Sequence, residues 1–224
     1  VDGTMALARQ AAERGVKTFV FVSSIKVNGE EPADGRIYTA DDVPQPTDPY
    51  GISKWEAENA LRALGAETGM AIVIIRPPLV YGPGVKANFA SMVQWVQKGI
   101  PLPLGDASNR RSLIFVGNLT DLIITAAQDK AAANQIFLAS DGTDLSVAEL
   151  FKAIAKACNR PSRLIPVPAF LMRLALICLG KRQIARRLFS SLQVDIEKTR
   201  TRLGWTPPFT VAEGLRKTVE GLDV

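Results

Sequence analysis

Residues 17–24 read KTFVFVSS, and this short stretch decides the fold. Its apolar residues are continuous, without the strict apolar–polar alternation of a strand that has one solvent-exposed face. The stretch therefore predicts a β-strand buried on both faces. A second stretch of the same kind, AIVIIRPP, occupies residues 71–78. Strands buried on both faces are typical of parallel sheets, whose neighbouring strands need a long, usually helical, connection. The sequence therefore predicts an α/β fold.

The segments around these two stretches alternate between helical and strand patterns. Helices are predicted over residues 4–14, 50–69, 88–98 and 119–128, and further strands over residues 112–116 and 135–140. Two capping boxes, SVAE at 146–149 and TVAE at 210–213, predict two more helices. Between the boxes, residues 159–205 predict a mostly helical lobe. The order predicts a doubly wound parallel sheet with a smaller appended lobe.

A sheet of this kind usually opens with a strand, a glycine-rich turn and an acidic residue about 20 positions later. Here a helical pattern starts almost at residue 1, and no strand pattern precedes it. The nearest glycine pattern is YGPG at 81–84, which has a proline between its glycines and lacks a third one. We interpret YGPG as a turn, so the residues given contain no phosphate-binding loop.

The composition narrows the class of protein. The 224 residues carry 27 basic and 22 acidic side chains, no histidine, and two cysteines, Cys158 and Cys178, which are too few for a disulfide framework or a thiolate metal site. The longest apolar stretch, residues 167–180, is interrupted by Arg173 and is shorter than the roughly 20 residues of a spanning helix. The first residues lack the pattern of a secretion signal. We expect a cytoplasmic protein without a membrane span.

The positive charge is concentrated toward the carboxyl end. Residues 160–202 hold ten basic and two acidic side chains, a pattern that indicates either a solvated helical face or a surface for phosphates or anionic lipid. No nucleic-acid-binding motif accompanies it. Residues 169–189, AFLMRLALICLGKRQIARRLF, are expected to pack as helices of the lobe. The alternative is that they lie on a membrane surface, with four cations near anionic headgroups: Lys181, Arg182, Arg186 and Arg187.

The stretch PYGISKWEAE at 49–58 carries the predicted chemistry. Tyr50 and Lys54 are four residues apart, so both project from one face of the predicted helix, above Ala57 and Leu61, which should face the sheet. The chain has no histidine to move protons near neutral pH. A phenol can do so only where a nearby cation favours the phenolate, and Lys54 is in the right place to be that cation. The alternative is that the Lys54 ammonium simply reaches solvent.

Two serines stand at the end of the first buried strand. Ser23 and Ser24 follow FVFV at the sheet edge where open α/β proteins bind ligands, although a serine there can also be a local cap. We predict that Ser24 hydrogen-bonds a substrate hydroxyl, that Tyr50 removes its proton, and that Lys54 holds the cofactor ribose. The hydride acceptor must be a nicotinamide, because no side chain accepts hydride.

At this point the sequence resembles the extended short-chain dehydrogenase/reductase family, in particular bacterial nucleotide-sugar epimerases of the UDP-glucose 4-epimerase type. The resemblance covers nearly the whole chain. It rests on five stretches in order: VDGTMALARQAAERGVKTFVFVSS, PYGISKWEAE, RPPLVYGPG, NRRSLIFV and LGWTPPFTVAEGL. It implies that residues 1–158 are the remainder of a Rossmann-like dinucleotide-binding domain, in which residues 78–110 contribute to a substrate lobe formed mainly by residues 159–224.

The resemblance also implies functional residues and ligands. The implied catalytic residues are Ser24, Tyr50 and Lys54. The implied cofactor-binding residues, for NAD or NADP, are Ser23, Tyr50, Lys54 and Pro77. The implied residues for a UDP-sugar are Asn88 and Arg111. We also predict that Lys26, which departs from the family pattern and adds a charge near the site, binds the substrate. A guanidinium suits the diphosphate because it binds oxygens as a bidentate fork, whereas the alternative for Arg111 is a solvated charge. The resemblance further implies a homodimer for the full-length protein and a longer amino-terminal part that carries the glycine-rich turn. We therefore expect the 224 residues alone to bind NAD poorly.

These features predict an NAD(P)-dependent nucleotide-sugar 4-epimerase that removes and returns a hydride at C4. Some residues depart from the family pattern, namely Asn28, Leu79, Gly117 and Asn118. The first alternative is therefore an NADPH-dependent UDP-4-keto-sugar reductase, since the sequence resembles a subgroup associated with O-antigen sugars of lipopolysaccharide. The second alternative is a non-catalytic binding module of the same fold.

Overall fold

The computed structural model describes residues 1–32, 35–104, 109–180 and 188–222, without the side chains of residues 87, 88, 169 and 176. Its central sheet has three parallel strands in the order β1 (Thr18–Val22), β2 (Ala71–Arg76) and β5 (Ile136–Leu138). A second parallel pair is formed by β3 (Leu79–Tyr81) and β4 (Leu113–Phe115). The predicted parallel α/β fold is confirmed.

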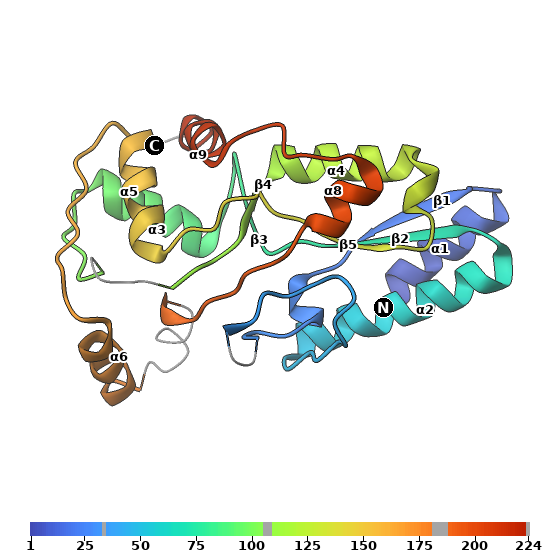
Figure 1. The fold of residues 1–224 in the computed structure, drawn as a ribbon, viewed down its shortest axis with the longest axis horizontal. Helices are drawn as coiled ribbons and strands as arrows, with labels where there is room; N and C mark the ends of the chain where they lie inside the picture. The colour runs from blue at the N-terminus through green and yellow to red at the C-terminus, as the bar shows by residue number, and fades with distance from the viewer. Residues whose placement is uncertain (33–34, 105–108, 181–187, 223–224) are drawn as a thin grey trace.

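Helices cover both faces of the central sheet. Among the described residues they are α1 (Asp2–Glu13), α2 (Pro49–Thr68), α3 (Ala87–Gln97), α4 (Val116–Gln128), α5 (Val147–Ala157), α6 (Ala169–Cys178), α8 (Glu197–Leu203) and α9 (Val211–Glu220), with short 3₁₀ turns η1 (Ile25–Val27) and η3 (Lys130–Ala132). Helices α1 and α2 lie on one face, and α4 and α8 lie on the other (Figure 1). No helix in the described ranges is long and apolar enough to cross a membrane.

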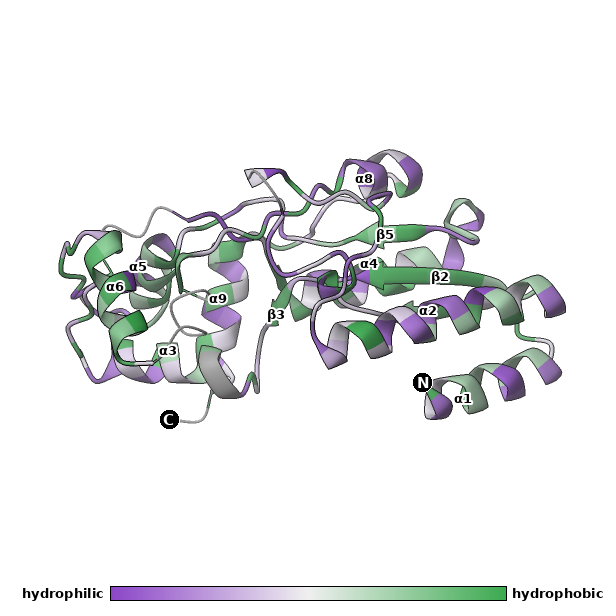
Figure 2. Cartoon of the chain, turned by 90° about the horizontal axis from the view of Figure 1, so that it is seen from below, coloured by the Kyte–Doolittle hydropathy of each residue, from purple (hydrophilic) through white to green (hydrophobic). Residues whose placement is uncertain are grey.

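The side chains of β2 alternate between two buried clusters, as the pleat of a strand requires. Ile72 and Ile74 pack with Ala57 and Leu61 of α2, whereas Val73 and Ile75 pack on the opposite face, where α4 contributes residues such as Leu122. Figure 2 shows the apolar strands β2 and β5 between the more polar helices. The expectation that Ala57 and Leu61 face the sheet is confirmed, and it fixes which side of α2 points inward.

Helix α2 has strong signals at both ends. The Asp48 side chain accepts a hydrogen bond of 2.6 Å from the Gly51 N–H, and Pro49 occupies the first turn, where its missing N–H costs nothing. At the other end Gly69 adopts a left-handed conformation with φ of 74°, and its N–H bonds to the carbonyl of Gly65. These signals place Tyr50 in the first turn of α2, next to the end of the sheet.

The packing crosses the predicted domain boundary at residue 158 in both directions. Helix α5, before the boundary, packs against α3 and α9 at the end of the molecule away from the central sheet. Helix α8, after the boundary, packs on β5 and η3. The reason is an extended segment that runs beside Arg111 and Tyr38 through β-bridges from Leu192 and Val194, and so carries the chain back to the sheet (Figure 1).

Three details of the predicted secondary structure were wrong. Residues 159–205 are not mostly helical where described, because extended chain forms a bridge from Leu164 before α6 and bridges from Leu192 and Val194 before α8. Helix α4 begins at Val116, directly after β4, rather than at residue 119. Strand β3 was missed because it is only three residues long, but the predicted turn is confirmed at residues 83–84. Both predicted capping boxes, at Ser146 and Thr210, are present.

A buried polar cluster around the Asp141 carboxyl group joins β3, α4 and the segment before α9. The Asn118 amide donates to Asp141 Oδ1 at 2.7 Å and to the Phe209 carbonyl at 2.9 Å, and its oxygen accepts from the Phe209 N–H at 2.9 Å. The Tyr81 hydroxyl donates to Asp141 Oδ2 at 2.7 Å. Burial raises the pKa of Asp141 and of Tyr81. The cluster ties β3, α4 and the segment before α9 to one carboxyl group.

Replacing Asn118 with alanine should destabilise the protein strongly. The Asn118→Ala change removes all three hydrogen bonds and leaves the Phe209 peptide groups without their buried partner, which should lower the free energy of unfolding by about 3 kcal/mol. Urea unfolding followed by circular dichroism measures this. The control Thr120→Ala, on the exposed face of α4, should stay within about 0.5 kcal/mol of the unchanged protein. Equal losses for the two variants would contradict the role of the cluster.

Candidate active site

Lys54 contacts the carboxyl end of β1. Its ammonium donates a hydrogen bond of 3.1 Å to the carbonyl of Val22, the last residue of the strand, and lies 4.8 Å from the centroid of the Phe21 ring. The same ammonium lies 5.9 Å from the centroid of the Tyr50 ring. Tyr50 is 51% exposed, so its phenol is open to a ligand. The structure thus brings the predicted tyrosine and lysine together on one face of α2.

Ser24 stands two residues beyond that carbonyl, at the start of η1. Its hydroxyl oxygen accepts a hydrogen bond of 3.3 Å from the Lys26 N–H, so the local-cap interpretation of this serine is confirmed. The cap uses only a lone pair of the oxygen, and a hydroxyl can donate its hydrogen at the same time. Ser24 can therefore cap η1 and still donate a hydrogen bond to a ligand oxygen.

The first turn of α2 packs closely against η1. A Cβ atom at Gly51 would lie 2.8 Å from the carbonyl oxygen of Lys26, so only glycine fits between Tyr50 and the serine segment. The Lys26 ammonium bonds the Asp48 carboxylate and lies 3.3 Å from Glu30. These contacts hold the start of α2 against η1. They also engage the Lys26 ammonium, which was predicted to bind substrate, with two carboxylates. A substrate-binding role for Lys26 stays a prediction.

The ion pair between Lys26 and Asp48 changes both ionisation equilibria. The hydrogen bond from the Lys26 ammonium holds the pKa of Asp48 below its usual range. It outweighs the opposing effect of burial, and the Gly51 N–H lowers the pKa further. Burial by itself would lower the pKa of Lys26, but the hydrogen bonds to Asp48 and Glu30 outweigh it and raise the pKa. The start of α2 is therefore fixed by charge as well as by packing.

Pro77 lies beside the same segment. Its carbonyl accepts a hydrogen bond of 3.0 Å from the Ile25 N–H, and the residue is buried directly after β2. Because Ser24 precedes Ile25, the predicted nicotinamide-side proline and the predicted catalytic serine lie on adjacent backbone segments. The carboxyl ends of β1 and β2 point toward the part of the molecule that holds α3, α5 and α9 (Figure 1).

A fully buried ion pair lies beneath these residues, and sequence reasoning missed it. Glu58 of α2 and Arg76 of β2 are both 0% exposed, and they are joined by bonds of 2.9 and 2.6 Å. The Ser23 hydroxyl donates to Glu58 at 2.5 Å. That hydroxyl is buried and already bonded to Glu58, and a cofactor-binding role for Ser23 stays a prediction. The signals available in the sequence were the arginine that ends the apolar run AIVIIR and the glutamate four residues after Lys54.

The two other predicted substrate residues lie farther along the chain. The Arg111 backbone bridges to Leu145 and Leu192, and its guanidinium donates to the Ser190 carbonyl at 3.3 Å. Burial lowers the pKa of Arg111, while the Glu31 carboxylate acts to raise it. Asn88 belongs to the first turn of α3, but its side chain lies outside the described residues. Binding of the diphosphate by Arg111 and Asn88 stays a prediction.

Helix α6 carries exposed apolar side chains. Phe170 is 68% exposed and Leu174 is 57% exposed, and α6 contributes no residue to the buried clusters of the described chain. Residues 169–178 are helical as expected, but this helix is not packed into the lobe through these side chains. The four cations proposed to meet a membrane, Lys181, Arg182, Arg186 and Arg187, lie outside the described residues.

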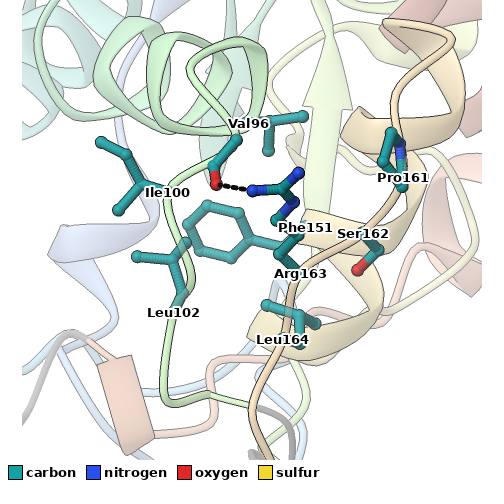
Figure 3. Close-up of a pocket in the computed structure, with 9 residues that line it drawn as sticks. Val96, Ile100, Leu102, Phe151, Pro161, Ser162, Arg163 and Leu164 are labelled. Carbon is teal, nitrogen blue, oxygen red and sulfur yellow. Dashed lines mark hydrogen bonds between the residues drawn. The ribbon is translucent and has the colours of Figure 1, made fainter.

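Two hollows in the described chain lie away from the predicted catalytic residues. The first lies between α3 and α5, where Arg163 donates to the Gly99 carbonyl at 3.2 Å, and its free volume is about 10 Å³, enough for one water (Figure 3). The second, about 280 Å³, lies beside the far end of α2 and is lined by residues such as Arg62 and Asn134. The candidate site is instead the open edge around Tyr50.

The chain matches known proteins by family and by sequence. A model of the NAD dependent epimerase/dehydratase family matches residues 1–139. A UDP-glucose 4-epimerase from Vibrio cholerae is 50% identical over 219 residues, which are 97% of this chain and 67% of that protein. An N-acetyl-alpha-D-glucosaminyl-diphospho-ditrans,octacis-undecaprenol 4-epimerase from Escherichia coli O157:H7 is 26% identical over 98% of this chain and 70% of that protein. The chain spans about two thirds of the length of these relatives.

Solved structures share the fold. The UDP-glucose 4-epimerase of Thermotoga maritima, determined with UDP-glucose, superposes with a TM-score of 0.75 at 23% identity, over 98% of this chain and 67% of that one. The UDP-glucose 4-epimerase of Thermus thermophilus, determined with NAD, gives a TM-score of 0.74 at 24% identity, over 98% of this chain and 68% of that one. At these identities the likeness concerns the fold, and the predicted Rossmann-like architecture is confirmed.

The ion pair at the start of α2 predicts a dependence of stability on pH. Because the pKa of Asp48 is lowered in the folded protein, its contribution to stability is present above the ordinary carboxyl pKa and is lost as the pH falls through the lower folded value. A double-mutant cycle with Asp48→Asn and Lys26→Gln should give a coupling energy of about 0.5 kcal/mol at pH 7, since the pair is partly exposed.

The same cycle repeated at about pH 2.5, below the ordinary carboxyl pKa, should give a smaller coupling energy. Chemical unfolding at the two pH values measures it. A coupling energy that stays constant or grows on acidification would show that the two side chains do not stabilise each other as charges.

Proposed function

The chain belongs to the NAD-dependent epimerase/dehydratase family, and from this membership we propose that the protein is an NAD(P)-dependent nucleotide-sugar 4-epimerase acting on a UDP-sugar. The observation that carries the proposal is the site at the end of β1. There the exposed Tyr50 phenol lies over the Lys54 ammonium, which is itself bonded to the Val22 carbonyl, two residues before Ser24. The 50% identity to a relative named UDP-glucose 4-epimerase supports the choice of substrate.

The side chains present fit a nicotinamide cofactor. An ammonium has three N–H donors, and the bond to Val22 uses one of them, so Lys54 can also bond ribose hydroxyls. Pro77, beside η1, supplies a buried wall at the same edge. NAD(P), when bound, supplies the hydride acceptor that no side chain provides. In this proposal Tyr50, Lys54 and Pro77 hold the cofactor.

The protein's own groups handle the proton. Ser24 donates a hydrogen bond to the C4 oxygen of the sugar, and Tyr50 takes the proton from that oxygen as the general base. The resulting 4-keto sugar then rotates in the site, so that its other face meets the cofactor. Tyr50 returns the proton to the oxygen while C4 is reduced on that face. The exposure of Tyr50 leaves room for this turn. No net oxidation occurs in the cycle.

Finer assignments belong to the same proposal. We assign the product to lipopolysaccharide assembly, which is supported by the 26% identity to the undecaprenol-linked epimerase. A cytoplasmic location is supported by the free thiols of Cys158 and Cys178, because unpaired cysteines suit a reducing compartment. We further propose a homodimer for the full-length protein, and contact of the exposed apolar residues of α6 with a membrane surface as an alternative role for that helix.

One assay separates the proposed reaction from the alternatives. The full-length protein is incubated with UDP-glucose and catalytic NAD, and the sugars are separated by chromatography. An epimerase yields UDP-galactose without net change in NADH absorbance. A 4-ketoreductase yields none, and it consumes NADPH stoichiometrically when given a UDP-4-keto sugar. A binding module does neither, so this result would reject the proposal outright.

Removing the phenol oxygen should abolish most of the turnover. In the Tyr50→Phe variant, kcat should fall by roughly 10² to 10⁴, since general acid/base transfer contributes that much, while the KM for the UDP-sugar changes little. The matched control is Tyr81→Phe, which deletes the same atom from a buried tyrosine bonded to Asp141. Its kcat should stay within about threefold of the unchanged protein, because no reacting group is touched. Equal activity of the Tyr50→Phe variant and the unchanged protein would remove Tyr50 from the mechanism.

A further inference from the structure

The buried ion pair between Glu58 and Arg76 is the centre of a larger network. Arg76 donates through Nε to Glu58 Oε1 at 2.9 Å and through Nη2 to Oε2 at 2.6 Å, which is a bidentate pair. Glu58 Oε1 also accepts from the Ser23 hydroxyl at 2.5 Å. The remaining arm of Arg76 donates through Nη1 to Asn28 Oδ1 at 2.9 Å, and the Asn28 amide donates to the Thr39 carbonyl at 3.0 Å.

This network touches every element that carries a residue of the candidate site. Glu58 lies on α2, one turn after Lys54 and two turns after Tyr50, on the stripe that faces the sheet. Ser23 directly precedes Ser24, and Arg76 directly precedes Pro77. Asn28 closes η1, the turn that Ser24 opens. The network therefore links α2, the end of β1, the end of β2 and η1 through one carboxylate and one guanidinium.

Stability does not explain why these charges are buried. Bringing a carboxylate and a guanidinium out of water is costly, and well-packed apolar side chains of similar size are often as stable or more stable. The polar neighbours of the pair are Ser23, Asn28 and the partly exposed Arg62, whose guanidinium lies 3.8 Å from Glu58. The neighbouring α2 and β2 residues Ala57, Leu61 and Ile74 form an apolar buried cluster. An apolar pair would fill this space, but it would not fix the angle of α2 to the strand ends. The directional bonds of the ion pair do that.

We propose that Glu58 and Arg76 are positioning residues, which hold α2 at the distance and angle from η1 that align Tyr50 and Lys54 with Ser24. The inference rests on the proposed function for the meaning of that alignment, but the geometry it describes is a property of the folded chain. Neither residue touches the substrate or cofactor in this proposal. They act through the backbone segments that they join.

The test replaces both charges with apolar side chains of similar size, in the Glu58→Leu/Arg76→Met double variant of the full-length protein. Removing both partners avoids an unpaired buried charge, so the melting temperature should fall less than in the single variants Glu58→Leu and Arg76→Met, although the Ser23 hydroxyl and the Asn28 amide oxygen lose a partner. The kcat for UDP-glucose should nevertheless fall at least tenfold, because a misplacement of about 1 Å can cost as much as 10²-fold. The KM should change less than about threefold, since the groups that bind the sugar nucleotide remain.

A second readout does not depend on activity. Hydrogen exchange followed by mass spectrometry reports the Ser23, Ile25 and Asn28 amides, which are bonded to the carbonyls of Ile75, Pro77 and Ile25. Peptides over residues 23–29 should exchange at least tenfold faster in the double variant, while peptides of α5 should not change. If the melting temperature of the double variant falls too far for these assays, the Ser23→Ala variant, which loses one hydrogen bond to Glu58, is used instead. Its kcat should fall about threefold, and its peptides over residues 23–29 should exchange about threefold faster.

The control is Ile154→Ala, which removes buried contacts in α5, away from the network. It should lower the melting temperature without changing kcat or the exchange of residues 23–29. A double variant with unchanged exchange over residues 23–29 overturns the proposal, whatever its activity. So does one with full kcat. If the protein without any substitution shows no epimerase activity, the proposed function is rejected. The exchange result would still decide the positioning role.

Discussion

The register between β1 and β2 is the constraint on which the site depends. Val22 lies opposite Ile75 in a parallel pair, so the two strands end side by side. The residues at these ends, Ser23–Ser24 after β1 and Arg76–Pro77 at the end of β2, therefore lie at the same edge of the sheet. Parallel strands always bring their carboxyl ends together in this way, which is why ligands of open α/β sheets bind there. Helix α2 must cross between the same strands, so its first turn arrives at the same edge.

Three kinds of contact hold that first turn in place. The Lys54 ammonium bonds the last carbonyl of β1, the absence of a side chain at Gly51 allows η1 to approach, and the buried pair of Glu58 and Arg76 anchors the next turns of the helix. The phenol of Tyr50 is left exposed beside a cation that is itself immobilised. In the proposed mechanism this site moves protons to and from a ligand oxygen without a histidine.

Sequence patterns predicted those parts of the structure that depend on local periodicity. The strands β1 and β2, the helix between them and the pairing of Tyr50 with Lys54 follow from runs and spacings that can be read directly. The predicted burial on both faces is confirmed for β2, but in β1 only Phe21 is buried among the described residues. The buried partner of Ser23 could not be predicted, because Glu58 and Arg76 are 18 residues apart and only the folded register brings them into contact. The return of α8 to the sheet was missed for a similar reason, since it depends on bridges from Leu192 and Val194 to distant residues. Strand β3 was too short to give a pattern.

In the proposed reaction a hydride leaves C4 of the sugar and returns to the same carbon within one site. The most direct measurement uses UDP-glucose that carries deuterium at C4, converted by the full-length protein in ordinary water and analysed by mass spectrometry and NMR. The account predicts UDP-galactose with the deuterium still on C4, because the hydride never exchanges with solvent. Loss of the deuterium to water, or its appearance at another carbon, would contradict the account.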